Sequence, residues 1–219
     1  MATALKESSD SPPETALRPV LPQGRMQIQL DEPLSDDEFW ELCKQNEDLI
    51  IEQNPDGRIV IMPPTGGTAG NLNFRLYPHL ARWIDEGGGG FGFDSNTIFR
   101  LPNGAKRMAD VAWVEGERYS ALTQEERDGV VPLAPDFVIE LRSPTDALDV
   151  LKNKMNEYMR TGVRLGWLID PQTETVTLYR ENTSPETLDR PDIVEAATIV
   201  EGFTLPMDRI WDPLGTSDA

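Results

Sequence analysis

Residues 137–170 read FVIELRSPTDALDVLKNKMNEYMRTGVRLGWLID, which predicts a strand, a helix and a second strand in succession. The first five residues are nearly all apolar, as in a strand buried at the centre of a sheet. Ser143 as N-cap and Pro144 at the first helical position predict where the helix begins, and Gly162 predicts its end. Residues 165–170 form the second strand. Such a unit is typical of a crossover between two parallel strands of one sheet.

The segments before this unit predict further helices and hairpins. In chain order they are a short helix that follows a capping box at 35–38, a hairpin over 49–62, a helix over 69–85, and a hairpin that joins 97–101 to 107–115. The expected fold class is therefore α/β, with a mixed β-sheet flanked by helices.

Composition divides the chain into three parts. Residues 1–24 are rich in Ser, Pro, Thr and Ala without an apolar period, so we expect a disordered leader there. Residues 25–213 are expected to form a single domain, and residues 214–219 a frayed end.

Charge and rare residues exclude several classes of function. The chain carries 20 basic and 38 acidic residues, a net charge of −18, which argues against coating nucleic acid or anionic membranes through bulk charge. One cysteine excludes an internal disulfide, and one histidine, His79, excludes a multi-histidine metal site. No apolar run approaches the ~18 residues of a membrane span. We expect a soluble, cytoplasmic protein that binds any metal through oxygen.

Two carboxylates interrupt apolar strand sequence. Asp110 stands between Met108-Ala109 and Val111, and Glu140 follows three apolar residues. Two carboxylates on neighbouring strands repel each other unless a cation lies between them, and Mg²⁺ or Mn²⁺ prefers such oxygen ligands. The other interpretation is that both are ordinary carboxylates at strand ends.

The sequence resembles the Uma-two family, whose members are described as bacterial restriction endonucleases within the PD-(D/E)xK nuclease superfamily. The resemblance runs from about residue 26 to residue 213, and its motifs are MADVAWV at 108–114, PDFVIELRSPTD at 135–146, the segment 154–158, Gly162-Val163 and WLIDP at 167–171. It implies a restriction-endonuclease-like core, an Mg²⁺- or Mn²⁺-dependent endonuclease that acts on DNA, and a homodimer. The sequence itself offers only scattered support for a dimer, such as the apolar residues within 203–211.

The resemblance also implies roles for individual residues. Asp110 and Glu140 are implied to bind the divalent ion, with the carbonyl of Leu141 as a third ligand. The lysine expected two residues after the glutamate is replaced by Arg142, which stays protonated and cannot act as a base. The resemblance points to Lys154 instead, as the residue that orients the attacking water or offsets charge on the phosphate.

Helical periodicity does not decide which lysine serves the site. Lys152 and Lys154 both lie at the boundary of the apolar helix face, and both stems can simply cover the rim of the core. Arg142 and Arg107 are candidates to hold the substrate backbone. Residues 142–164 carry five basic and three acidic residues, which allows a small positive rim on an acidic body.

Two alternatives remain open at this point. The chain can be a catalytically degenerate nuclease-fold dimer that acts as a binding or regulatory module, which Arg142 and the acidic composition favour. It can also be a hydrolase that uses the same carboxylates on a small phosphate ester.

Overall fold

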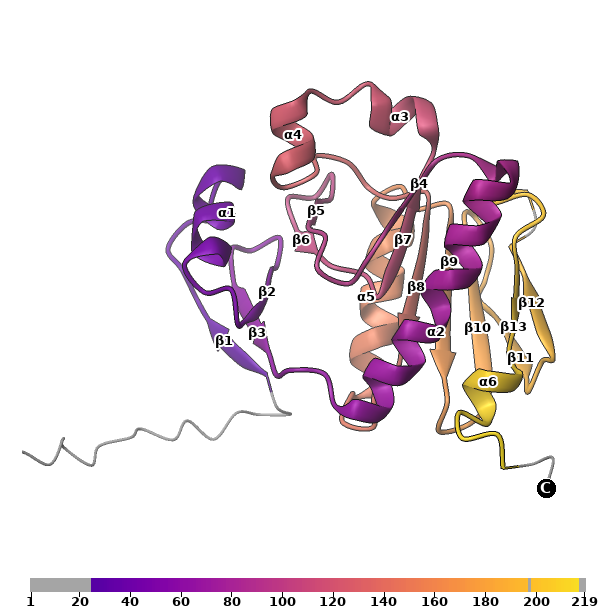
Figure 1. Ribbon diagram of the computed structural model, residues 1–219. Helices are drawn as coiled ribbons and strands as arrows, with labels where there is room; N and C mark the ends of the chain where they lie inside the picture. The colour runs from indigo at the N-terminus through magenta and orange to yellow at the C-terminus, as the bar shows by residue number, and fades with distance from the viewer. Residues whose placement is uncertain (1–24, 197, 217–219) are drawn as a thin grey trace, which may run out of the picture.

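The computed structural model describes residues 25–196 and 198–216, arranged as two main β-sheets with helices around them (Figure 1). The expected leader at 1–24 lies outside the described residues, as do 217–219 of the expected frayed end. In the described ranges, no helix is both long and apolar enough to cross a bilayer.

The larger sheet has six strands in the order β11-β10-β9-β8-β7-β4. Their bounds are β4 Phe91–Phe93, β7 Val111–Val114, β8 Phe137–Leu141, β9 Leu165–Asp170, β10 Thr175–Arg180 and β11 Glu186–Asp189. Strand β8 is buried along its whole length and pairs in parallel with β9 and antiparallel with β7. The helix α5, Leu148–Arg160, connects β8 to β9, which confirms the predicted strand–helix–strand unit and the mixed sheet.

Two helices cover opposite faces of this sheet. Because side chains alternate along a strand, Val111 and Ala112 of β7 belong to different core clusters. The cluster with Val111 includes apolar residues of α2, Gly67–Trp83, and the cluster with Ala112 includes those of α5. Figure 1 shows α2 and α5 on the two sides of β8.

A smaller sheet of five strands, in the order β1-β3-β2-β6-β5, packs beside α1, Asp36–Lys44. Its strands are β1 Met26–Ile28, β2 Ile50–Gln53, β3 Ile59–Met62, β5 Phe99–Arg100 and β6 Lys106–Arg107. The capping box of Ser35 and Glu38 is present, and β2 and β3 form the expected antiparallel hairpin.

The remaining elements include several that complete the large core. These remaining elements are the π-helical turn η2 Ile84–Gly88, α3 Gly116–Ser120, α4 Gln124–Asp128, the antiparallel pair β12 Ile193–Glu195 and β13 Thr204–Pro206, and α6 Asp208–Trp211. The apolar residues that the sequence offered as a dimer surface lie in this core of the chain itself: Phe203, Leu205, Met207 and Ile210. They therefore give no support to a dimer.

The predicted start of the helix between β8 and β9 at Ser143 is wrong. Helix α5 begins at Leu148, because residues 143–146 form a separate turn. The Asp146 carboxylate accepts hydrogen bonds from the backbone N–H and the hydroxyl of Ser143, and it also pairs with Arg25 at 2.9 Å. Serine, proline and aspartate favour turns as well as helix starts, so the same residues fit both structures.

The predicted hairpin of 97–101 with 107–115 is only half right. Residues 99–100 pair with 106–107 in the smaller sheet, whereas β7 belongs to the larger sheet and pairs with β4 and β8. Met108, Ala109 and Asp110 connect the two sheets, which places Asp110 where the chain passes from one sheet into the other.

Candidate active site

A pocket of about 620 Å³ lies at the carboxyl end of β8, beside the first turn of α2 and the N-terminal half of α5. Its lining includes the predicted site residues Asp110, Glu140, Leu141 and Lys154. The structure thus brings four of the six predicted site residues into one pocket.

Asp110 directly precedes β7 and Glu140 lies on β8, so the two carboxylates meet at the same end of the sheet. Val111 is opposite Ile139 in the antiparallel pair of β7 and β8, so continuing the register by one residue places Asp110 opposite Glu140. The backbone N–H of Leu141 also donates to Asp110 Oδ2 at 2.7 Å. The side chains therefore enter the pocket side by side, as the metal hypothesis requires.

Burial makes both carboxylates unusual. Loss of water around Glu140, with the nearby charge of Asp110, raises the pKa of Glu140 to about 7 even though Lys154 opposes the shift. Burial likewise raises the pKa of Asp110 above its ordinary value, against the opposing hydrogen bond from Leu141. A shift of this kind at two carboxylates in one pocket is a feature of functional sites.

The Lys154 ammonium lies between two carboxylates. It contacts Glu140 Oε1 at 3.0 Å and Glu52 Oε1 at 2.9 Å, and it donates to the carbonyl of Met108 at 2.7 Å. These contacts use all three of its N–H donors. Burial lowers the pKa of Lys154, but the carboxylates of Glu140 and Glu52 outweigh burial and hold the pKa above its ordinary value. Lys154 therefore remains charged.

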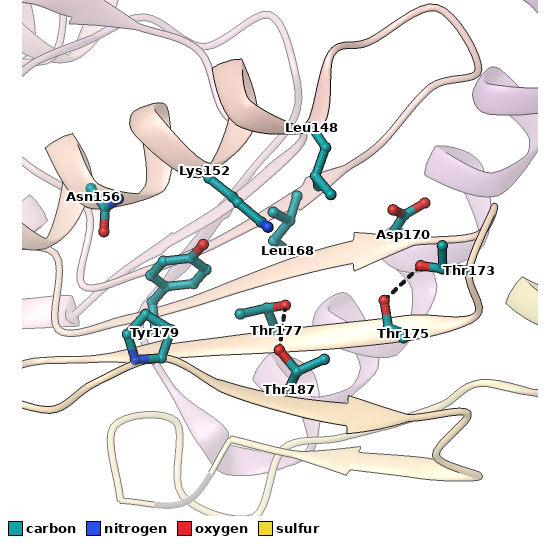
Figure 2. Close-up of a pocket in the computed structure, with 11 residues that line it drawn as sticks. Leu148, Lys152, Asn156, Leu168, Asp170, Thr173, Thr175, Thr177, Tyr179 and Thr187 are labelled. Atoms are coloured by element: carbon teal, nitrogen blue, oxygen red, sulfur yellow. Dashed lines mark hydrogen bonds between the residues drawn. The ribbon is translucent and has the colours of Figure 1, made fainter.

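Lys152 lies elsewhere. It lines a second pocket, of about 380 Å³, between α5 and strands β9 to β11. Figure 2 shows its ammonium above Leu168, in a pocket that also contains two hydrogen-bonded pairs of threonine hydroxyls. Thr177 of β10 pairs with Thr187 of β11, and Thr173 pairs with Thr175 where the turn after β9 enters β10. The structure thus separates the two lysines that periodicity left equivalent.

Glu52 is a site residue that the sequence analysis missed. It lies on β2, is 5% exposed, and accepts from the backbone N–H of Met108 at 3.1 Å as well as from Lys154. Glu52 follows the apolar residues Ile50 and Ile51, just as Glu140 follows an apolar run. The sequence pattern around Glu52 could have indicated a functional carboxylate. Its contact with Lys154 was not visible in the sequence, because the two residues are far apart along the chain.

The two predicted arginines lie outside the lining of the pocket. Arg107 is buried, and all three of its nitrogens are engaged: Nε by Glu157, Nη1 by Gln53 and Glu52, and Nη2 by Asn54. Its evident role is to hold Glu52 rather than a substrate.

Arg142 is only partly committed to other residues. Its Nε donates to the carbonyl of Asp146 at 3.2 Å and its Nη1 to Asp170 at 2.8 Å, while Nη2 has no partner among the described residues.

The charged residues around Lys154 and Arg107 form a cluster whose net charge favours a divalent cation. When all of its groups are ionised, four carboxylates face two cations, an excess of two negative charges; the members are Asp110, Glu140, Glu52, Glu157, Lys154 and Arg107. Carboxylate oxygens are the ligands that Mg²⁺ and Mn²⁺ prefer. No group of three Asp, Glu, His or Cys side chains within the described ranges is arranged to hold a metal, so Asp110 and Glu140 need a further ligand such as a backbone carbonyl. The residues present fit a hard divalent ion.

The chain is similar to a known family and to a solved structure. The profile of the Uma2 family, described as "Putative restriction endonuclease", matches residues 36–208. Among solved structures, the chain is similar to one described as a putative nuclease belonging to DUF820 from Anabaena variabilis ATCC 29413, with a TM-score of 0.67 and 21% sequence identity over 82% of this chain and 98% of that chain. At this identity the likeness shows the fold alone. No curated protein matches the sequence.

Proposed function

Because the chain belongs to the Uma2 family of putative restriction endonucleases, we propose that it is a metal-dependent endonuclease of the PD-(D/E)xK type that hydrolyses phosphodiester bonds of DNA. The observation that supports this most is the pocket at the end of β8, where the buried Glu140 and the partly buried Asp110 lie beside the largely buried Lys154. The excess negative charge of this cluster calls for a divalent cation.

In this proposal the ion is Mg²⁺ or Mn²⁺, held by the carboxylates of Asp110 and Glu140 and by the carbonyl of Leu141. Such an ion supplies Lewis acidity, which polarises a phosphoryl oxygen and lowers the pKa of water. These residues would hold it at the carboxyl end of β8, in the pocket.

Lys154 acts as a fixed cation in this mechanism and not as a base. Its raised pKa keeps it protonated, and its contact with Glu140 Oε1 holds that carboxylate in place. The positive charge offsets negative charge that develops on the phosphoryl oxygens during hydrolysis. The ammonium also contacts Glu52 on β2, which ties it to the smaller sheet.

Arg142 is the proposed contact to the substrate backbone. It directly follows Leu141 in the sequence, and its Nη2 keeps its N–H donors available. Arg107 is not part of this proposal, since its nitrogens are all engaged. A protein with a net charge of −18 needs such local contacts, because bulk attraction to DNA is absent.

We also retain the homodimer as a proposal that rests on the family resemblance. Sedimentation of the full chain at micromolar concentration tests it. A dimer is expected, and a monomer would contradict the proposal.

Incubation of the chain with plasmid and single-stranded DNA in Mg²⁺ or Mn²⁺ tests the proposed activity. We expect cleavage that EDTA abolishes and that Asp110→Ala lacks. Equal cleavage by the wild type and Asp110→Ala would show a contaminating nuclease. Absence of cleavage with retained Mn²⁺ binding would contradict the nuclease and favour either the binding module or a hydrolase of small phosphate esters, which a small phosphate ester substrate distinguishes.

A further inference from the structure

The proposed metal ligands Asp110 and Glu140 each accept a hydrogen bond from an uncharged side chain, and the two donors stand on different helices. Asn73 on α2 donates through Nδ2 to Asp110 Oδ1 at 3.0 Å. Tyr158 on α5 donates its hydroxyl to Glu140 Oε1 at 3.0 Å. Since α2 and α5 cover opposite faces of the sheet, these donors reach the pocket from its two sides.

The amide of Asn73 is held in an orientation that leaves one of its own atoms unsatisfied. Its Oδ1 is buried and accepts no hydrogen bond from the described residues. Turning the amide over would place Oδ1 against Asp110 Oδ1, and two acceptors repel each other. A buried acceptor without a donor is unfavourable, so the bond to Asp110 must outweigh that cost.

The hydroxyl of Tyr158 shares its acceptor with a cation. Both Tyr158 and Lys154 lie against Oε1 of Glu140, while Oε2 accepts no hydrogen bond from the described residues. Tyr158 is 1% exposed, so its ring is locked by packing in the core beneath the pocket. The Glu140 carboxylate is thereby fixed through one oxygen, and the other is left for a ligand.

Neutral donors have a specific advantage at this place. A cation at either position would cancel part of the excess negative charge, whereas an amide or a phenol orients a carboxylate and leaves its charge intact. A carboxylate has about four lone-pair sites, so one such bond does not prevent it from binding an ion.

From these contacts we infer that Asn73 and Tyr158 are positioning residues, which hold Asp110 and Glu140 from opposite faces of the sheet in the geometry that binds a divalent cation. This inference rests on the metal dependence in the proposed function. Residues that orient metal ligands typically change metal affinity about 10- to 100-fold when they are mutated.

Calorimetric titration of the full chain with Mn²⁺ alone, without DNA, tests the inference. The variants are Tyr158→Phe, which removes a single oxygen, and Asn73→Leu, which keeps a similar shape without the donor. Each is expected to weaken Mn²⁺ binding about 10-fold or more. Because the donors hold different carboxylates, the losses should multiply in the double variant.

Matched controls separate positioning from general damage. Asn71→Leu changes an exposed asparagine of the same helix, and Tyr179→Phe changes a tyrosine of the second pocket. Both should bind Mn²⁺ as the wild type does. Circular dichroism and thermal melting of every variant verify that it is folded at the titration temperature.

The outcomes are distinct from those of the nuclease test. Unchanged Mn²⁺ affinity in folded Tyr158→Phe and Asn73→Leu overturns the inference, even if the wild type cleaves DNA. Weakened affinity in both, with no cleavage by the wild type, supports the inference and contradicts the nuclease. A wild type that binds no Mn²⁺ at millimolar concentration overturns the inference as well.

Discussion

Lys152 and Lys154 stand two positions apart on α5, and the structure gives them opposite surroundings. Lys154 is largely buried in the pocket at the end of β8, where two carboxylates and a carbonyl take its three N–H donors. Lys152 is exposed above strands β9 to β11, among hydroxyl groups, and has no ion-pair partner in the described part of the chain (Figure 2). Two residues rotate a helix by about 200°, which is enough to separate them.

The comparison shows what distinguishes a site lysine from a surface lysine. The sequence neighbours, the helix and the residue type are shared, so none of these decides the role. What differs is the cluster of carboxylates that reaches Lys154 from β8 and from the smaller sheet. If this contrast is real, equal substitutions at the two positions must have very unequal effects.

The largest effect is expected for Lys154→Met. The substitution leaves Glu52 and Glu140 buried without their shared cation, and breaking a buried ion pair in this way costs about 3–5 kcal/mol. Urea denaturation of the metal-free chain measures the free energy of unfolding. A loss below about 1 kcal/mol would mean that the contacts of Lys154 contribute as little as those of a surface pair.

An intermediate effect is expected for Glu52→Gln. The amide keeps an acceptor for the N–H of Met108 but removes one of the two charges that hold Lys154. We expect a loss of about 1–3 kcal/mol in the same denaturation experiment. Glu47→Gln is the matched control, since Glu47 is exposed on the surface. If the two variants were equally stable, the assignment of Glu52 to the site would be contradicted.

The smallest effect is expected for Lys152→Met, the direct counterpart of Lys154→Met. An exposed lysine without an ion pair should change the free energy of unfolding by no more than about 0.5 kcal/mol. Its Mn²⁺ affinity should equal that of the wild type. A large change in either quantity would contradict the assignment of the two lysines to separate pockets.

The parts of the fold that local patterns specify were predictable. The apolar run of β8, the end of α5 near Gly162 and the capping box at Ser35 each depend on neighbouring residues, and each is found in the structure. The start of α5 was not, because Ser143 and Asp146 satisfy a turn with the residues that would cap a helix. The division of 107–115 between two sheets depends on distant partners, which a sequence does not display.

The candidate site was predictable to a similar degree. Asp110 and Glu140 stand out because a carboxylate at an apolar strand is costly, and they do share a pocket. Glu52 carries the same signal without a visible partner, and Asn73 and Tyr158 carry none, since an amide or a phenol on an amphipathic helix is ordinary. These residues gain their significance only from what they contact in three dimensions.

Calorimetric titration of Mn²⁺ into the wild type, Asp110→Asn and Glu140→Gln tests the central claim most directly. If Asp110, just before β7, and Glu140, on β8, hold one divalent ion, the wild type binds a single Mn²⁺ per chain. Each variant keeps the shape of its side chain and loses more than about 100-fold in affinity, beyond the typical effect of residues that only orient ligands. Binding of equal strength by all three proteins would contradict the account.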